Sequence, residues 1–315
     1  MARHHNGQHI EVEPERRVRV AKERSMHIGV AVTERYQITE VMQIAQRAEA
    51  LGFDSLWVPE HPIIPVHIPT PFPNSPDGRV PEAYAHWPDP FVTLTAVATV
   101  TSRLKLATGI CLVPEREPLV TAKVVASLDV LSHGRVLLGV GGGALREETE
   151  ILGTPFGRRW QRLREHVEAM KALWTQEEAS YQGEFVRFPA VKSYPKPSQQ
   201  PHPPVLLGAQ RGPRVLARVA RYCEGWMPFG IAPDEVREAI TRIHHLARDA
   251  GRRLEMLDVT VITTPDGLTR ELLRRYQDAG VHRLVLPLRA GAGAGVTSLD
   301  HLAHLAPVVE QAQQG

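Results

Sequence analysis

The chain has 315 residues, and its 43% hydrophobic and 23% charged residues give it the composition of a globular protein, which excludes a disordered chain. Its 37 basic and 35 acidic residues leave a formal net charge of +2, which favours neither nucleic acid nor an anionic membrane as a partner. Two cysteines provide no disulfide framework or paired-cysteine metal motif, and no run of about 18 apolar residues predicts a membrane span. We therefore expect a cytoplasmic protein without a metal, whose partner is a small molecule.

The first 25 residues differ from the rest of the chain. Residues 1–25 mix Arg, Glu and His without helical or strand periodicity, and they lack the apolar core of a secretion signal. A strand pattern begins at Met26, which is itself a candidate translation start. We interpret residues 1–25 as a mobile N-terminal extension and residues 26–315 as one domain.

From Met26 onward, short apolar runs alternate with longer segments of helical period, a pattern typical of a parallel sheet with crossover helices. The predicted strands are the eight segments 26–32, 55–60, 104–110, 135–140, 204–208, 225–229, 257–263 and 282–288. The predicted helices are the eight segments 38–51, 89–102, 119–132, 158–174, 212–223, 234–251, 268–280 and 298–313. Equal numbers of strands and helices predict a closed (β/α)8 barrel of the α/β class rather than an open doubly wound sheet.

Two connections are longer than a barrel needs. Residues 61–88 follow the second predicted strand, at the end of the barrel where active sites lie, and they are rich in Pro and His. Residues 176–203 follow the fourth predicted helix at the opposite end, and the segment QGEFVRF within them is expected to form a hairpin. We interpret both as insertion loops, and the first as a functional loop.

The second predicted strand ends at Glu60 and His61, where a barrel presents its active-site residues. A histidine exchanges a proton near neutral pH, so His61 is the candidate general acid or base. Glu60 is a candidate to orient His61 or to bind a coenzyme ring. The alternatives are a histidine bonded to loop backbone and a solvated carboxylate, but the place of both residues at a strand end favours a functional role.

Glycines follow two other predicted strands. Residues 141–143 follow the fourth strand, where glycine lets the backbone approach a flat ring or a phosphate closely. Residues 208–212 end the fifth strand and open a helix, whose free N–H groups and dipole favour phosphate. The first segment does not match a dinucleotide-binding fingerprint, and the second is equally compatible with an ordinary strand-to-helix turn.

Taken in chain order, these strand ends lie in stretches that resemble the luciferase-like monooxygenase superfamily, and within it the branch that uses the deazaflavin coenzyme F420. The stretches are AEALGFDSLWVPEH, DPFVTLTAVATVTSRLKLATGICLVP, AKVVASLDVLSHGRVLLGVGGGALREETEILGTPFGRR, KALWTQEEASYQGEF, and PKPSQQPHPPVLLGAQ followed by ARVARYCEGWMPFG. The resemblance implies a TIM barrel of the bacterial luciferase type with F420 as its coenzyme. FMN, which other branches use on the same barrel, is the alternative.

The resemblance also implies a place for each site residue. His61 takes the acid or base role beside the reactive ring, with Glu60 before it. Gly109 and Ile110 stand where relatives carry a non-prolyl cis peptide against that ring. The other residues expected at the coenzyme are Gly141, Gly142 and Gly143 at its ring, Gly208, Ala209, Gln210, Arg211 and Gly212 at its phosphate, Trp226 at the end of the sixth strand, and Arg146.

The poly-glutamyl tail of F420 would need basic partners, although the chain as a whole is nearly neutral. Arg116, Arg146 and Arg158 lie on loops after the third and fourth predicted strands. We expect these arginines to form a local basic surface that binds the tail.

The chain departs from its relatives at Ala144, where some of them place a catalytic glutamate, and this disfavours sugar-phosphate dehydrogenase chemistry. We predict a homodimeric F420-dependent oxidoreductase that transfers a hydride between the deazaflavin and a small organic substrate. Two alternatives stay open: an FMN-dependent monooxygenase that uses reduced flavin and O2, and a barrel that binds the coenzyme without turnover. A phosphate-binding aldolase is disfavoured because no lysine ends a predicted strand.

Overall fold

The computed structural model describes residues 26–73, 75–254, 256–288 and 297–313. The predicted N-terminal extension, residues 1–25, lies outside the described residues, so its mobility stays a prediction. Within the part of the chain that the structure describes, no helix is both long enough and apolar enough to cross a bilayer.

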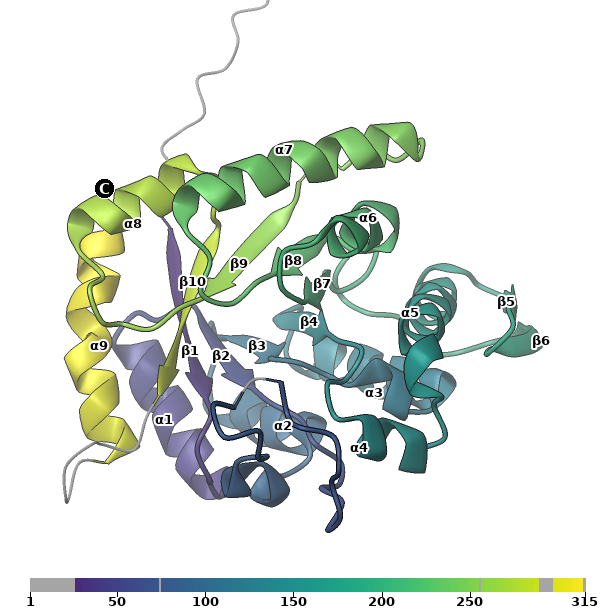
Figure 1. The fold of residues 1–315 in the computed structure, drawn as a ribbon, viewed down its shortest axis with the longest axis horizontal. Helices are drawn as coiled ribbons and strands as arrows, with labels where there is room; N and C mark the ends of the chain where they lie inside the picture. The colour runs from purple at the N-terminus through teal and green to yellow at the C-terminus, as the bar shows by residue number, and fades with distance from the viewer. Residues whose placement is uncertain (1–25, 74, 255, 289–296, 314–315) are drawn as a thin grey trace, which may run out of the picture.

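The barrel strands are parallel and close in the order β1-β10-β9-β8-β7-β4-β3-β2, which confirms the predicted fold class (Figure 1). The apolar runs form these strands because a parallel strand covered on both faces needs no polar alternation. The strands are β1 His27–Val32, β2 Ser55–Val58, β3 Lys105–Thr108, β4 Val136–Val140, β7 Val205–Gly208, β8 Gly225–Met227, β9 Asp258–Ile262 and β10 Arg283–Leu288. The predicted hairpin also forms, from β5 Ala179–Gln182 and β6 Arg187–Val191, which pair antiparallel as a separate sheet.

Helices surround the barrel (Figure 1). All of the predicted helices form, as α1 Ile38–Ala50, α2 Pro90–Val100, α3 Pro118–Leu131, α5 Arg159–Thr175, α6 Pro213–Tyr222, α7 Pro233–Asp249, α8 Arg270–Asp278 and α9 Ser298–Gln313. A further α-helix, α4 Arg146–Ile151, is absent from the predicted pattern because six residues are too few to show a helical period. Three short 3-10 helices, Glu82–His86, Val113–Glu115 and Phe156–Arg158, are also absent from it. Figure 1 shows α4 and the loop 61–88 on the same side of the barrel, beyond the tips of the strand arrows.

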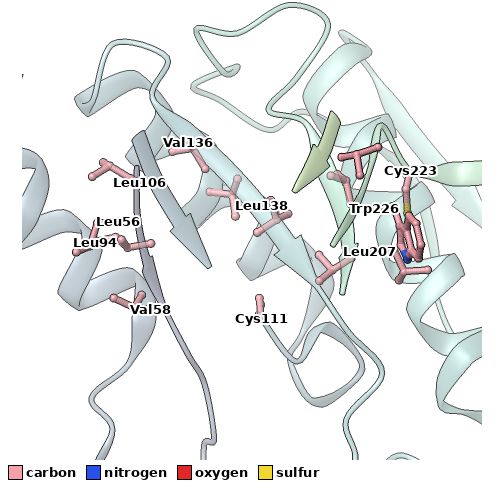
Figure 2. Packing of buried hydrophobic residues seen from close by; sticks show 14 of the residues in the cluster. Leu56, Val58, Leu94, Leu106, Cys111, Val136, Leu138, Leu207, Cys223 and Trp226 are labelled. Atoms are coloured by element: carbon pink, nitrogen blue, oxygen red, sulfur yellow. The ribbon is translucent and has the colours of Figure 1, made fainter. Parts of the chain in front are cut away.

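Side chains of the strands point alternately into the barrel and outward to the helices. The inner cluster consists of Ala31, Trp57, Ala107, Leu137, Leu206, Met227 and Val285. The outer side chains pack between strands and helices, and Figure 2 shows part of this layer, which includes Leu138, Leu207 and Trp226. Because Met227 belongs to the inner cluster, its neighbour Trp226 points outward.

Strands β3 and β4 lie close together at Gly139 of β4. A Cβ atom at this position would lie 2.1 Å from the main-chain oxygen of Thr108 on β3. The Thr108 hydroxyl donates a hydrogen bond of 2.7 Å to the Gly139 carbonyl, and the Cys111 amide donates one of 2.8 Å to the same oxygen. These bonds hold the end of β3 against β4, so a side chain at Gly139 must separate the two strands.

We predict that Gly139→Ala lowers the free energy of unfolding by at least about 2 kcal/mol, because the atom it meets is main chain and cannot turn aside. Gly157→Ala is the matched control, since a Cβ there meets nothing within 4 Å. Urea unfolding followed by circular dichroism measures both variants. Equal stability of Gly139→Ala and the unaltered protein would contradict the prediction.

Candidate active site

A cavity of about 470 Å³ opens at the carboxyl ends of the strands, on the side of the barrel where the sequence predicts the site. It brings together these predicted residues: Glu60, His61, Gly109, Ile110, Gly142, Gly143, Gly208, Ala209 and Gln210. Its volume lies in the range of small-molecule and cofactor sites. No cluster of His, Cys, Asp and Glu side chains suited to a metal ion occurs among the described residues.

Other predicted residues lie outside this cavity. Arg211 and Gly212 line a separate hollow at the start of α6, and Arg211 pairs with two glutamates of α7, which weakens its predicted role at a phosphate. Trp226 is fully buried in the outer layer, so its predicted contact with the coenzyme is wrong. Its Nε1 instead donates a hydrogen bond of 3.0 Å to the carbonyl of Ala209, which holds the cavity rim in place.

Gly141 does not line the cavity either. A Cβ atom at Gly141 would lie 1.9 Å from Cδ1 of Ile110, so Gly141 provides room for the Ile110 side chain. Its amide donates a hydrogen bond of 3.0 Å to the carbonyl of Cys111. Gly141 therefore supports the wall from behind instead of lining it.

The arginines expected at an acidic tail have carboxylate partners. These pairs are Arg116 with Glu60 and Asp89, Arg146 with Glu150, and Arg158 with Glu184. Arg116 is the most restricted, because its side chain is only 21% exposed and holds two acids. The structure therefore removes Arg116 from the predicted tail surface, whereas the roles of Arg146 and Arg158 stay predictions.

The peptide bond between Gly109 and Ile110 is cis, as predicted. It follows β3, where the Gly109 amide donates a hydrogen bond of 2.7 Å to the carbonyl of Val58. Ile110 lies beside Gly208, where a Cβ atom would be 2.4 Å from Cγ2 of Ile110. This wall of the cavity is therefore main chain and one aliphatic side chain, a surface that suits the face of a flat ring.

His61 lies at the cavity with its side chain 11% exposed, and its Nδ1 is 2.7 Å from Oε2 of Glu148. Glu148 is fully buried and comes from α4, the helix that the sequence pattern does not reveal. A buried carboxylate at Nδ1 fixes the orientation of the ring and leaves Nε2 as the ring nitrogen that does not contact Glu148. Glu148 is thus the residue that orients His61, and the expectation that Glu60 does so is wrong.

Aromatic rings from the loop 61–88 cover His61. The ring of Tyr84 is stacked on it with centroids 5.1 Å apart, and the ring of Trp87 with centroids 5.6 Å apart. Tyr84 and Trp87 also contact each other, with centroids 4.1 Å apart. These rings, which the sequence analysis does not single out, fix the plane of the imidazole and shield it from solvent.

Glu60 is 4% exposed, and its carboxylate is held from two sides. Oε2 accepts a hydrogen bond of 2.6 Å from the Leu112 amide, and Oε1 accepts one of 2.6 Å from Nε of Arg116. Arg116 also donates to Asp89, the N-cap residue of α2, at 2.5 Å. These bonds tie the end of β2 to the segment after β3, and a contact between Glu60 and a coenzyme ring stays a prediction.

A further carboxyl group, that of Glu115, is 9% exposed and lies behind Gly143. Its Oε1 accepts a hydrogen bond of 2.8 Å from the Thr149 hydroxyl, whereas its Oε2 has no hydrogen-bond partner in the described part of the chain. Burial, and next the negative charge of Glu148, raise the pKa of Glu115 to about 8. Glu115 is therefore protonated at neutral pH, so two negative charges do not adjoin behind His61.

Arg159 and Trp160, from the start of α5, also line the cavity. Trp160 packs on the backbone of Gly142, where a Cβ atom would lie 3.2 Å from the indole ring. Arg159 donates a hydrogen bond of 3.2 Å to the carbonyl of Gly143. The sequence pattern does not reveal either residue, because helical periodicity places them in a helix without showing that its first turn faces the cavity.

Comparison with known sequences identifies relatives of this chain. The profile of the family described as luciferase-like monooxygenase matches residues 25–265. Uncharacterized protein Rv0953c of Mycobacterium tuberculosis is 42% identical over 249 residues, which are 78% of this chain and 87% of that protein. The F420-dependent glucose-6-phosphate dehydrogenase of Amycolatopsis mediterranei is 31% identical over 201 residues, 62% of this chain and 55% of that protein. The oxygenase component of the flavin-dependent trigonelline monooxygenase of Acinetobacter baylyi is 30% identical over 180 residues, 56% and 45% of the two chains.

Solved structures share the fold. Monooxygenase RslO1 from Streptomyces bottropensis superposes with a TM-score of 0.72 at 21% identity, over 90% of this chain and 98% of that one. An F420-dependent secondary alcohol dehydrogenase, solved with an F420-acetone adduct, superposes with a TM-score of 0.70 at 19% identity, over 90% and 99% of the two chains. At these identities the likeness shows the barrel fold alone.

We predict that Glu115 makes stability depend on pH. Its pKa is raised from 4.5 to about 8, so between these values the folded protein keeps a proton that the unfolded chain has lost. The free energy of unfolding therefore falls as pH rises through this window, by up to about 1.4 kcal/mol per pH unit. Glu115→Gln has no proton to lose and should flatten this fall. Urea unfolding of both proteins at pH values from about 5 to 9 measures the difference, and parallel profiles would contradict the raised pKa.

Proposed function

Because the chain belongs to the luciferase-like monooxygenase family, we propose that it is an oxidoreductase that transfers a hydride between coenzyme F420 and a small organic substrate. The observation that carries this proposal is the pair His61 and Glu148, 2.7 Å apart at the cavity. When a hydride is transferred between an alcohol and a carbonyl, a proton is transferred as well. A histidine oriented by a carboxylate can take up or release that proton. A cytoplasmic homodimer is part of the same proposal.

The cavity fits a flat coenzyme ring. Its wall at Gly109, Gly142 and Gly208 is main chain, and Cβ atoms at these positions would fall within 4 Å of neighbouring side chains. Gly143 has a φ of +77°, a conformation that favours glycine. These backbone segments, with Ile110, would hold the ring. When bound, the deazaflavin supplies the hydride donor or acceptor.

The side chains at the cavity would handle the proton. With Nδ1 oriented by Glu148, the free Nε2 of His61 takes the hydroxyl proton when an alcohol is oxidised and returns it when a carbonyl is reduced. The carboxylate of Glu148 stabilises the imidazolium that forms in the first case. Tyr84 and Trp87 hold the imidazole against rotation, so no rearrangement is needed before the transfer.

The relatives of the chain leave two candidate coenzymes, because one relative is named an F420-dependent dehydrogenase and another a flavin-dependent monooxygenase. A proton-exchanging pair in the cavity favours hydride transfer with F420. An FMN-dependent monooxygenase is the second candidate, favoured by the 30% identity with the trigonelline enzyme. It would need reduced flavin and a path for O2 to the ring.

Titration of the purified protein with each coenzyme tests this choice. We predict that F420 binds at least about tenfold more tightly than FMN, because its long anionic tail adds charged contacts beyond those of a single phosphate. Deazaflavin fluorescence and flavin absorbance give the two dissociation constants. Binding of FMN without binding of F420 would exclude the F420-dependent function and support the FMN-dependent monooxygenase.

Replacement of His61 distinguishes an enzyme from a barrel that only binds the coenzyme. We predict that His61→Ala lowers turnover by about 10²- to 10⁴-fold and flattens its pH dependence around neutrality, because the positioned proton acceptor is lost. The affinity for the coenzyme should change little. His67→Ala, an exposed histidine in the same loop, is the matched control.

Steady-state rates at saturating coenzyme and substrate, with a binding titration for each variant, provide these measurements. Glu148→Gln should lower turnover by a smaller factor, because the amide can still meet Nδ1 but carries no charge. Turnover of His61→Ala equal to that of His67→Ala would exclude His61 as the acid or base.

A further inference from the structure

The loop 61–88 provides an apolar side of the cavity. Phe72, Tyr84 and Trp87 of this loop line the cavity, as His61 does. Phe72 is 4% exposed, and its ring meets the ring of Tyr84 edge-on, with centroids 5.9 Å apart and planes at 86°. Tyr84 in turn is stacked on His61. The two nearly perpendicular rings form a corner, and an alcohol or carbonyl group beside His61 would have its carbon frame in this corner.

The loop is held in place at both ends. The Thr70 amide donates a hydrogen bond of 3.1 Å to Oε1 of Glu147, the residue before Glu148 in α4. At the other end, Nε1 of Trp87 donates one of 3.2 Å to the carbonyl of Glu34, which follows β1. These bonds fix the loop to α4 and to the end of β1, so a substrate does not have to order the rings when it binds.

A tight turn presents Phe72 to the cavity. The Phe72 amide donates a hydrogen bond of 2.8 Å to the carbonyl of Gly78, whose φ of +71° favours glycine. Within the turn, Oδ1 of Asp77 accepts hydrogen bonds from the Ser75 hydroxyl at 2.6 Å and the Arg79 amide at 3.0 Å. The side chains of Asp77 and Arg79 do not line the cavity. The turn therefore places an aromatic ring inside and its charged groups outside.

Positive charge is scarce in the cavity. Among the described residues that line it, Arg159 is the one arginine or lysine. Its guanidinium lies 3.7 Å from the centroid of the Phe156 ring and donates a hydrogen bond of 3.2 Å to the carbonyl of Gly143, so it is held beside the segment after β4. A carboxylate or phosphate of a substrate would lie beside Phe72 and Tyr84 without a cationic partner, and burial of an unpaired charge is strongly unfavourable.

Hydrogen-bonding side chains are also few. In the described part of the chain, no Ser, Thr, Asn or Asp side chain lines the cavity. The amide nitrogen of Gln210 is already used, since it donates a hydrogen bond of 3.0 Å to the carbonyl of Phe229. A substrate with many hydroxyl groups would leave most of them without partners when it lost its water, and this lowers affinity. A single oxygen beside His61 has no such cost.

We propose that the substrate is an uncharged cyclic alcohol or its ketone, whose carbon ring packs in the corner between Phe72 and Tyr84. The inference rests on the proposed function, which supplies the reaction, and it names the substrate class. In the oxidation, the C–H bond at the alcohol carbon breaks, and the hydride passes with its electron pair to oxidised F420. The O–H bond breaks as well, its proton passes to Nε2 of His61, and the carbonyl forms.

Three alcohols with the same six-membered carbon ring test this class. Cyclohexanol is uncharged, 4-hydroxycyclohexanecarboxylate adds a negative charge, and myo-inositol adds hydroxyl groups. Loss of deazaflavin absorbance as F420 is reduced gives kcat/KM for each alcohol with the unaltered protein. We expect the value for cyclohexanol to be at least about 10²-fold above each of the others, because the rings offer neither a cation nor hydrogen-bond partners.

Two variants of Phe72 separate the apolar contact from the shape of the corner. Leucine and asparagine have nearly the same shape, so Phe72→Leu and Phe72→Asn differ mainly in polarity. We expect Phe72→Asn to have a KM for cyclohexanol at least about tenfold above that of Phe72→Leu, with a similar kcat, because the pair at His61 is unchanged. Val66→Asn is the matched control, since Val66 is an exposed residue of the same loop that does not line the cavity.

A titration with F420 accompanies each measurement and shows whether the protein binds its coenzyme. A higher kcat/KM for the carboxylate or for inositol than for cyclohexanol would overturn the substrate class and leave the proposed function standing. Equal KM values for the two Phe72 variants, or turnover of none of the alcohols by a protein that binds F420, would do the same. The comparison of alcohols needs no variant, so it decides even if a Phe72 variant does not fold. Failure of the unaltered protein to bind F420 would overturn the proposed function and this inference with it.

Discussion

The contact between His61 and Glu148 is the interaction on which the mouth of this barrel depends. A fully buried carboxylate without a partner would destabilise the fold by on the order of several kcal/mol, and the imidazole is the partner that the structure provides. The contact fixes α4 above the end of β4 and the start of the loop 61–88 above the end of β2. The rings of Tyr84 and Trp87 then close over an imidazole that is already held.

Two other acidic residues at the mouth of the barrel, Glu60 and Glu115, are neutralised without contacting His61. Glu60 is balanced by Arg116, which also holds the N-cap of α2 through Asp89. Glu115 keeps its proton at neutral pH, because burial and the charge of Glu148 raise its pKa to about 8. A substrate in the cavity therefore meets an imidazole with a fixed orientation and not a set of competing carboxylates. This separation of roles is what the proposed role of His61 as proton acceptor requires.

The sequence predicts the barrel because each strand is a short apolar run and each long helix has its own period, so both signals are local. It predicts the place of His61 because His61 stands at a strand end, and strand ends converge in a barrel. The cis bond after Gly109 is predicted by the resemblance to the luciferase-like family and by no local pattern. It misses Glu148, since α4 is too short to show a period and the acidic run Glu147-Glu148 is typical of a solvated turn. Trp226 is wrongly assigned because a strand end alone does not say which face a side chain takes.

The wall of the cavity explains why the barrel alone does not decide between deazaflavin and flavin. Main chain at Gly109, Gly142 and Gly208 would contact a flat ring by shape, and the rings of deazaflavin and flavin have nearly the same shape. Discrimination must then arise from groups that respond to charge, which lie on either side of this wall. On one side His61 favours chemistry that moves a proton with the hydride. On the other, the guanidinium groups of Arg159 and Arg218 lie over the ring of Trp160, at 5.6 Å and 4.4 Å from its centroid. Under the proposed function, a change of coenzyme would therefore require changes in charged groups around the mouth of the barrel and not in the strands.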